Sequence, residues 1–224
     1  MKLNITFLVC LLTLFLTPSC NKKNQPDIFQ FEKEEYFLKY DQTVNLLTHR
    51  DQQGIIWTNS NKQVGELTKL GTFIAKKIGS TKIKAKLGSD IIETKITVEP
   101  YITSISEPYT KFGVKKEDVK KNENKPIIIE DITGIIYQGN NGLIKEIYYI
   151  FYNNIYSSSM LIFNINKEND LEDLLTFYKE RYSISEKLNG EWYFENQHSD
   201  YLVAIRNDPN YGYYALYHSI KLPK

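Results

Sequence analysis

The chain of 224 residues has no excess of charge of either sign and almost no cysteine. Its 28 basic and 27 acidic residues leave a net charge of +1, which is too little to attract a nucleic acid electrostatically. The two cysteines are Cys10 and Cys20, so the sequence after Cys20 can form no disulfide and can supply no catalytic thiol. We therefore expect no nucleic-acid partner, and a fold stabilised by its hydrophobic core alone.

The sequence also lacks the motifs of common hydrolases, because it contains neither H-E-x-x-H nor G-x-S-x-G. Its three histidines are His49, His198 and His218. The spacing His198-x-Asp200 fits a pair of metal ligands, but it is more typical of a polar turn before a strand. We expect neither an enzyme nor a bound cofactor or metal, and a hydrolase with an unrecognised site is the alternative.

The N-terminal apolar run is too short to span a bilayer comfortably. It covers the twelve residues from Ile5 to Leu16 and follows the basic Lys2. As a helix it would be about 18 Å long, against a hydrocarbon core of about 30 Å. Residues 1–19 are therefore predicted to be a signal peptide.

The end of this run resembles the signal of bacterial lipoproteins, in which a small residue precedes the cysteine that receives the lipid. Ser19 and Cys20 fit that pattern, whereas the usual leucine lies one position early, at Leu16. The resemblance implies that Cys20 is the lipid attachment site and that the protein is held at a membrane. Plain secretion and an uncleaved anchor are the alternatives.

The composition changes along the rest of the chain and divides it into parts. Residues 20–32 are polar and are predicted to form a tether. Of the 17 tyrosines, 13 lie at or after Tyr137, which places a domain boundary near residues 100–105. We therefore expect one domain over residues 33–100 and a second over residues 105–224.

The first predicted domain contains short segments of alternating apolar and polar residues, such as Lys82 to Leu87. We expect six or seven antiparallel strands in an all-β sandwich, with Trp57 as a core anchor rather than a ligand-stacking residue. The domain resembles the bacterial Ig-like domain of group 2, which implies an extracytoplasmic spacer or adhesion module without catalytic residues. The stretches that carry the resemblance are I-W-T-N-S at 56–60, V-G-E-L at 64–67, L-G-T-F-I-A at 70–75, I-G-S-T-K-I-K-A at 78–85 and K-I-T-V at 95–98.

The second predicted domain is α+β. One short helix is expected over residues 113–121, and another runs from Asp170 to Tyr182, capped by Asn169 and with one apolar face. Strands are expected over residues 127–137, 143–152, 156–165, 191–195, 201–206 and 213–219. We expect these to form a six-stranded antiparallel sheet with the two helices on one face and the other face open.

Tyrosines on the open face are the candidate binding residues. Tyr211, Tyr213 and Tyr217 share one face of the last predicted strand, and Tyr148 and Tyr152 are second choices. Tyrosine offers a flat apolar ring with a polar tip, which suits a glycan or a protein partner. The alternative is that they form an ordinary sheet surface or core, because a slip of one residue in register exchanges the two faces.

Together these features predict a protein of mixed fold class in the cell envelope, anchored by lipid to the outer membrane on its periplasmic or its surface side. An Ig-like sandwich would present a C-terminal binding domain to a glycan or protein partner. The alternative function is an envelope scaffold or assembly protein without a small-molecule ligand.

Overall fold

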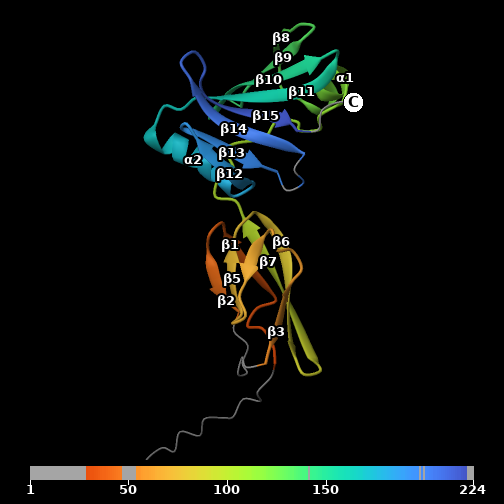
Figure 1. Cartoon of the computed structure of the whole chain (residues 1–224), viewed down its shortest axis with the longest axis vertical. Coiled ribbons are helices and arrows are strands. Elements are labelled where there is room, and N and C mark those ends of the chain that lie inside the picture. Colours follow the sequence, from red (N-terminus) through yellow and green to blue (C-terminus); the bar gives the residue numbers. More distant parts are fainter. Residues whose placement is uncertain (1–28, 47–53, 141, 197, 199, 221–224) are drawn as a thin grey trace, which may run out of the picture.

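The computed structural model describes residues 29–46, 54–140, 142–196, 198 and 200–220. The predicted signal peptide, Cys20 and the tether up to residue 28 lie outside the described residues. The described chain is mostly β-strand, with two helices (Figure 1). Neither of these helices is long and apolar enough to cross a bilayer.

Two sheets make up the N-terminal part of the molecule. The first contains, in spatial order, β1 (Glu35–Lys39), β7 (Asp90–Glu99), β6 (Gly79–Leu87) and β3 (Ile56–Asn59); the second contains β2 (Thr43–Asn45), β5 (Thr72–Ala75) and β4 (Gly65–Leu67). β1 pairs with β7 in parallel, and the other paired strands are antiparallel. Buried residues from both sheets, such as Ile83 and Phe73, form one hydrophobic cluster, so the core lies between the sheets.

Trp57 on β3 joins two hydrophobic clusters and is only half-buried. Its ring lies over Gly71, where an added Cβ would come within 2.5 Å of the indole. Phe31 packs against the same ring, with 6.0 Å between the centroids. Phe29 is buried in the second cluster, so packing begins before residue 33, where the predicted tether was expected to end.

One antiparallel sheet of eight strands dominates the C-terminal part. In spatial order it contains β12 (Ser183–Leu188), β13 (Glu191–Glu195), β14 (Tyr201–Asp208), β15 (Gly212–Ser219), β11 (Ile155–Phe163), β10 (Ile144–Tyr152), β9 (Gly134–Gln138) and β8 (Ile127–Glu130). In Figure 1 the order runs upward from β12, next to the N-terminal part, to β8 at the far end.

The sheet is larger than the six strands expected from the sequence. The predicted strand over residues 127–137 is two strands, because Asp131 closes a turn by accepting the N–H groups of Thr133 and Gly134 at 2.7 and 2.8 Å. β12 was missed, since its sequence S-I-S-E-K-L is mostly polar and it lies at the sheet edge. Asn189 and Gly190, both with positive φ, form the tight turn to β13.

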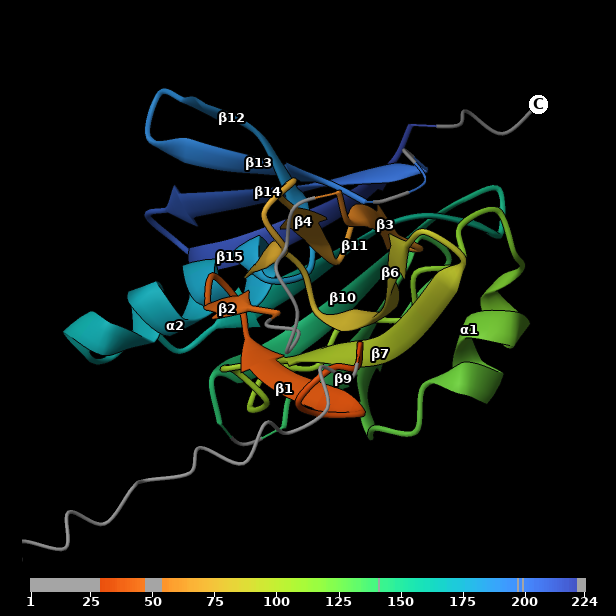
Figure 2. The same ribbon diagram turned by 90° about the horizontal axis from the view of Figure 1, so that it is seen from below.

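Both helices cover the same face of this sheet, α1 (Lys116–Asn122) near one end of the strands and α2 (Glu168–Lys179) near the other (Figure 2). Val119 of α1 and Phe177 and Tyr178 of α2 belong to one core cluster with the inward residues of the sheet. α2 begins earlier than predicted, with Lys167 rather than Asn169 as its N-cap. The Asp170 carboxylate accepts the backbone N–H of Lys167 at 2.9 Å and closes the first turn.

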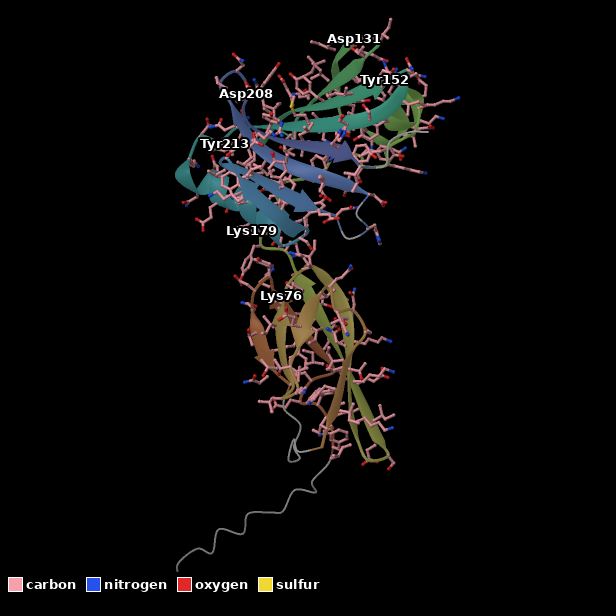
Figure 3. All side chains as sticks on the ribbon, in the orientation of Figure 1. Lys76, Asp131, Tyr152, Lys179, Asp208 and Tyr213 are labelled. Atoms are coloured by element: carbon pink, nitrogen blue, oxygen red, sulfur yellow. The ribbon has the colours of Figure 1, made fainter. Side chains whose placement is uncertain are left out.

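The C-terminal end of α2 contacts the N-terminal part. Lys77 donates from Nζ to the carbonyl oxygen of Lys179 at 2.7 Å, and the N–H of Ile78 donates to the carbonyl oxygen of Glu180 at 2.8 Å. Figure 3 shows the labelled Lys179 at the base of the C-terminal part and Lys76 at the facing end of the N-terminal part. Apart from this junction the cores are separate, because one cluster draws on residues 102–217 and the others on residues 29–98.

Candidate functional site

Two of the five candidate tyrosines lie on the helix side of the large sheet. Tyr217 is wholly buried, and its hydroxyl lies 2.7 Å from that of Tyr178 on α2. Tyr213 shares this face and packs against the edge of the same core. The prediction that they share an open binding face is therefore wrong, because the register of β15 turns odd-numbered positions toward the helices.

Tyr148 and Tyr211 lie on the other side of the sheet and are neighbours. Tyr148 is half-buried on β10 and donates its hydroxyl to Glu146 at 2.8 Å. The pKa of Tyr148 is raised to about 12, mainly by burial. The hydrogen bond and charge of Glu146 and the nearby Tyr211 hydroxyl act in the same direction. Tyr211 itself is about half exposed, in the turn between β14 and β15. Tyr148 therefore belongs to the open face, whereas Tyr211, which was expected to share a face with Tyr213 and Tyr217, lies in the turn beside it.

Tyr152 lies far from Tyr213, at the opposite end of the strands (Figure 3), and borders a cavity of about 690 Å³. This cavity, which we call the aromatic pocket, is built from segments that are distant in the sequence. They are residues 110–113, the β10–β11 hairpin with Tyr152, Tyr156 and Ser157, Asp200 before β14, and His218 and Ser219 at the end of β15.

Stacked aromatic rings form the floor of the aromatic pocket. Phe112 and Tyr156 lie nearly parallel, with centroids 4.7 Å apart. Tyr156 is buried, and its hydroxyl donates to the carbonyl oxygen of Tyr109 at 2.7 Å and lies 2.8 Å from Ser159 Oγ. Burial raises the pKa of Tyr156, so its hydroxyl stays protonated and the floor carries no charge.

The wall of the pocket is fixed to the hairpin by backbone hydrogen bonds. Gly113 N–H donates to the carbonyl oxygen of Tyr156 at 2.9 Å, and Tyr156 N–H donates to that of Val114 at 2.8 Å. The hairpin turns tightly at Asn153 and Asn154, both at positive φ, as two-residue turns require. The floor is therefore preformed, whereas Tyr152 at the rim is 71% exposed and can adjust to a ligand.

The rim carries polar groups of several kinds. Lys111, Asp200 and His218 supply a cation, a carboxylate and an imidazole, and Thr110, Ser157 and Ser219 supply hydroxyls. A flat apolar floor with such a rim suits a ligand that has one apolar face and many hydroxyl groups at its edge.

His218 at this rim has a buried serine, Ser158, as a neighbour. His218 Nδ1 lies 3.4 Å from the hydroxyl of Ser158, beyond the roughly 2.6–3.2 Å over which a base takes a proton. Ser158 is also buried and does not line the pocket.

His198 and Asp200, considered above as metal ligands, border different cavities. Asp200 lines the aromatic pocket, and His198 lines a smaller cavity of about 280 Å³ near the domain junction. Among the residues that the structure describes, no group of three or more histidine, cysteine or acidic residues could hold a metal ion.

The sequence pattern did not predict most residues of the aromatic pocket as site residues, because they lie in four separate segments of the chain. Phe112 precedes the helix expected over residues 113–121, and neither it nor His218 had a predicted binding role. The one local signal is the Asn153-Asn154 pair, which marks a tight turn and so places Tyr152 at the tip of a hairpin. Searches against protein-family models and curated proteins give no match for this chain.

Proposed function

We propose that this protein is a lipid-anchored component of the bacterial cell envelope, held at the outer membrane through Cys20. The proposal rests on the short apolar run that ends at Ser19 and Cys20. The N-terminal part would act as an Ig-like spacer. Its two facing sheets and its group-2 sequence stretches support that role.

The C-terminal part would bind a glycan in the aromatic pocket. The carrying observation is the Phe112–Tyr156 stack beneath a rim of hydroxyl, amine, imidazole and carboxylate groups. The apolar face of a sugar ring would stack on Phe112, the partly exposed ring of this pair, and its hydroxyls would hydrogen-bond to the rim. Tyr152, exposed at the rim, would cover the bound sugar.

The binding site is tested by comparing two exposed tyrosines. Tyr152→Ala should weaken binding to the positive members of a neutral and acidic oligosaccharide array by about tenfold, roughly 1.4 kcal/mol. Tyr211→Ala is the matched control, since Tyr211 is also exposed in a turn but lies outside the pocket. If only Tyr211→Ala weakens binding, the ligand occupies the open sheet face. If no oligosaccharide binds the wild type, the glycan proposal is wrong.

The anchor is tested separately with Cys20→Ala, expressed in a host that processes lipoproteins. This variant should leave the membrane fraction, and mass spectrometry of the wild-type N-terminus should find lipid on Cys20. Retention of the variant in membranes would instead favour the uncleaved apolar segment as the anchor.

The second candidate function is an envelope scaffold without a small-molecule ligand. The observation that favours it is the exposed, apolar edge strand β8, which offers a surface for another protein.

A further inference from the structure

The edge strand β8 exposes an unusual amount of apolar surface. Ile127, Ile128 and Ile129 are 42%, 52% and 53% exposed, and Ile132 in the following turn is 88% exposed. On a sheet edge, such residues normally mark a place where another strand pairs.

The backbone of β8 can accept another strand. The N–H of Gln138 donates to the carbonyl oxygen of Pro126, and the N–H of Asp131 donates to that of Gly134, at 2.9 and 3.0 Å. Ile127 and Glu130 are each next to one of these bonded positions, so their own backbone groups point away from β9. The register shift between Ile127 and Ile129 is what lets both residues, three positions apart, face the same side. Two residues of this edge thus present outward N–H and C=O groups.

We propose that β8 pairs antiparallel with β8 of a second copy of this chain. The two-fold axis passes between Ile128 and Ile129. It brings the outward N–H and C=O groups of Ile127 in each copy opposite those of Glu130 in the other copy, which makes two equivalent pairs. The same register sets Ile128 beside Ile129 of the second copy, so the exposed isoleucines cover one another.

The charges at the two ends of the edge favour this direction. Lys125 precedes the strand and Asp131 follows it, so antiparallel copies place each lysine near the other copy's aspartate, whereas parallel copies would place like charges together. Lys125 also pairs with Glu123 at 2.9 Å, and Lys120 pairs with Glu130 at 3.1 Å. Hydrogen bonds from Thr133 and Gly134 lower the pKa of Asp131, which keeps it charged.

The position of the edge determines what the pairing would join. β8 lies at the end of the molecule remote from the N-terminal part (Figure 1). Paired copies therefore extend in opposite directions, an arrangement that links molecules on two facing surfaces. This inference is independent of the aromatic pocket, which lies at the ends of the strands rather than at the sheet edge.

Sedimentation velocity of a chain that starts at Asn21 and keeps every described residue tests the proposal. The interface is small, so the dimer should form at about 10–500 µM chain. Ile127→Glu places like charges opposite Glu130 of the second copy twice and should raise the dissociation constant about tenfold or more. Adding Glu130→Lys to this variant should restore the dimer, because the charges across the axis then attract.

The matched control is Leu188→Glu, which introduces a charge at a similarly exposed position on the opposite edge strand, β12. It should leave the dimer intact. If Ile127→Glu does not fold, Ile127→Pro carries the test, since it removes an outward N–H and no ladder hydrogen bond. A wild type that stays monomeric at 500 µM, equal weakening by Leu188→Glu, or no rescue by the charge exchange would each overturn the proposal.

Discussion

The carboxylate of Glu180 accepts the backbone N–H of Tyr101 at 2.8 Å, although the two residues lie 79 positions apart. Glu180 is wholly buried, and its carboxylate also pairs with the guanidinium of Arg181. Its carbonyl oxygen accepts the N–H of Ile78. One residue after α2 therefore binds both the segment that leaves β7 and the segment that enters β6, which fixes the angle between the two parts of the molecule.

Glu180→Ala should destabilise the protein strongly. It removes a wholly buried carboxylate and so takes this partner from the largely buried Arg181 guanidinium and from the N–H of Tyr101, which typically costs about 3–5 kcal/mol. Urea denaturation measures the loss. Glu172→Ala, at an exposed position on the same helix, should change stability by less than about 0.5 kcal/mol. Equal midpoints for the two variants would show that Glu180 does not hold the junction.

The strands and helices of the fold were largely predictable, because their signals are local. The alternation in β6 matches its burial pattern, with Ile83 and Ala85 inward and Lys82, Lys84 and Lys86 outward. The apolar stripe of α2 likewise faces the core through Leu174 and Tyr178.

The face of the large sheet that each tyrosine occupies was not predictable from local pattern. Both faces of β15 carry aromatic and aliphatic residues, with Tyr213, Ala215 and Tyr217 on one and Tyr214 and Leu216 on the other, so either set could be buried. The choice is decided by Tyr178, 39 residues earlier, whose hydroxyl meets that of Tyr217. The aromatic pocket depends on similar long-range contacts, such as that of Phe112 with Tyr156 and Tyr201.

Gly71→Ala tests the packing of Trp57. Gly71 has φ +77°, where an alanine costs about 1–2 kcal/mol, and its Cβ would also clash with the indole ring, adding about 1–3 kcal/mol. Gly88→Ala is the control, because Gly88 has φ +62° with no atom within 4 Å of an added Cβ. Thermal melting should show the larger loss for Gly71→Ala. Equal losses would mean that the indole ring of Trp57 moves aside with no loss of stability.

Stability should depend on pH through Glu107, which receives a hydrogen bond from the hydroxyl of Tyr182. Residue Glu107 is exposed in part, but the burial of its carboxyl raises its pKa above the usual 4.5, against the opposing effects of Tyr182 and Arg181. The folded state then holds a proton that the unfolded state has lost. The free energy of unfolding should therefore fall as the pH rises from about 4.5 through the raised pKa.

Glu107→Gln removes this ionisation, so the variant should gain stability relative to the wild type between pH 4 and pH 7. Glu93→Gln should instead lose stability relative to the wild type over the same pH range, because the hydrogen bond and charge of Lys84 lower the pKa of Glu93. Chemical denaturation at the two pH values measures both. A shift of the same sign in the two variants would contradict the assignment of Glu107.

The buried hydroxyls of Tyr178 and Tyr217 should show strong coupling in a double-mutant cycle. They lie 2.7 Å apart, and burial raises the pKa of both, so each stays protonated. Tyr217→Phe removes the hydroxyl that faces Tyr178, which should cost about 1–3 kcal/mol. The double Phe variant removes both groups and should cost less than the sum of the single changes, with a coupling of about 0.5–2 kcal/mol. Urea denaturation of the four proteins gives the cycle. Additive losses of stability would mean that the two hydroxyls are not energetically coupled. Loss of oligosaccharide binding in Tyr217→Phe would return Tyr217 to the candidate site.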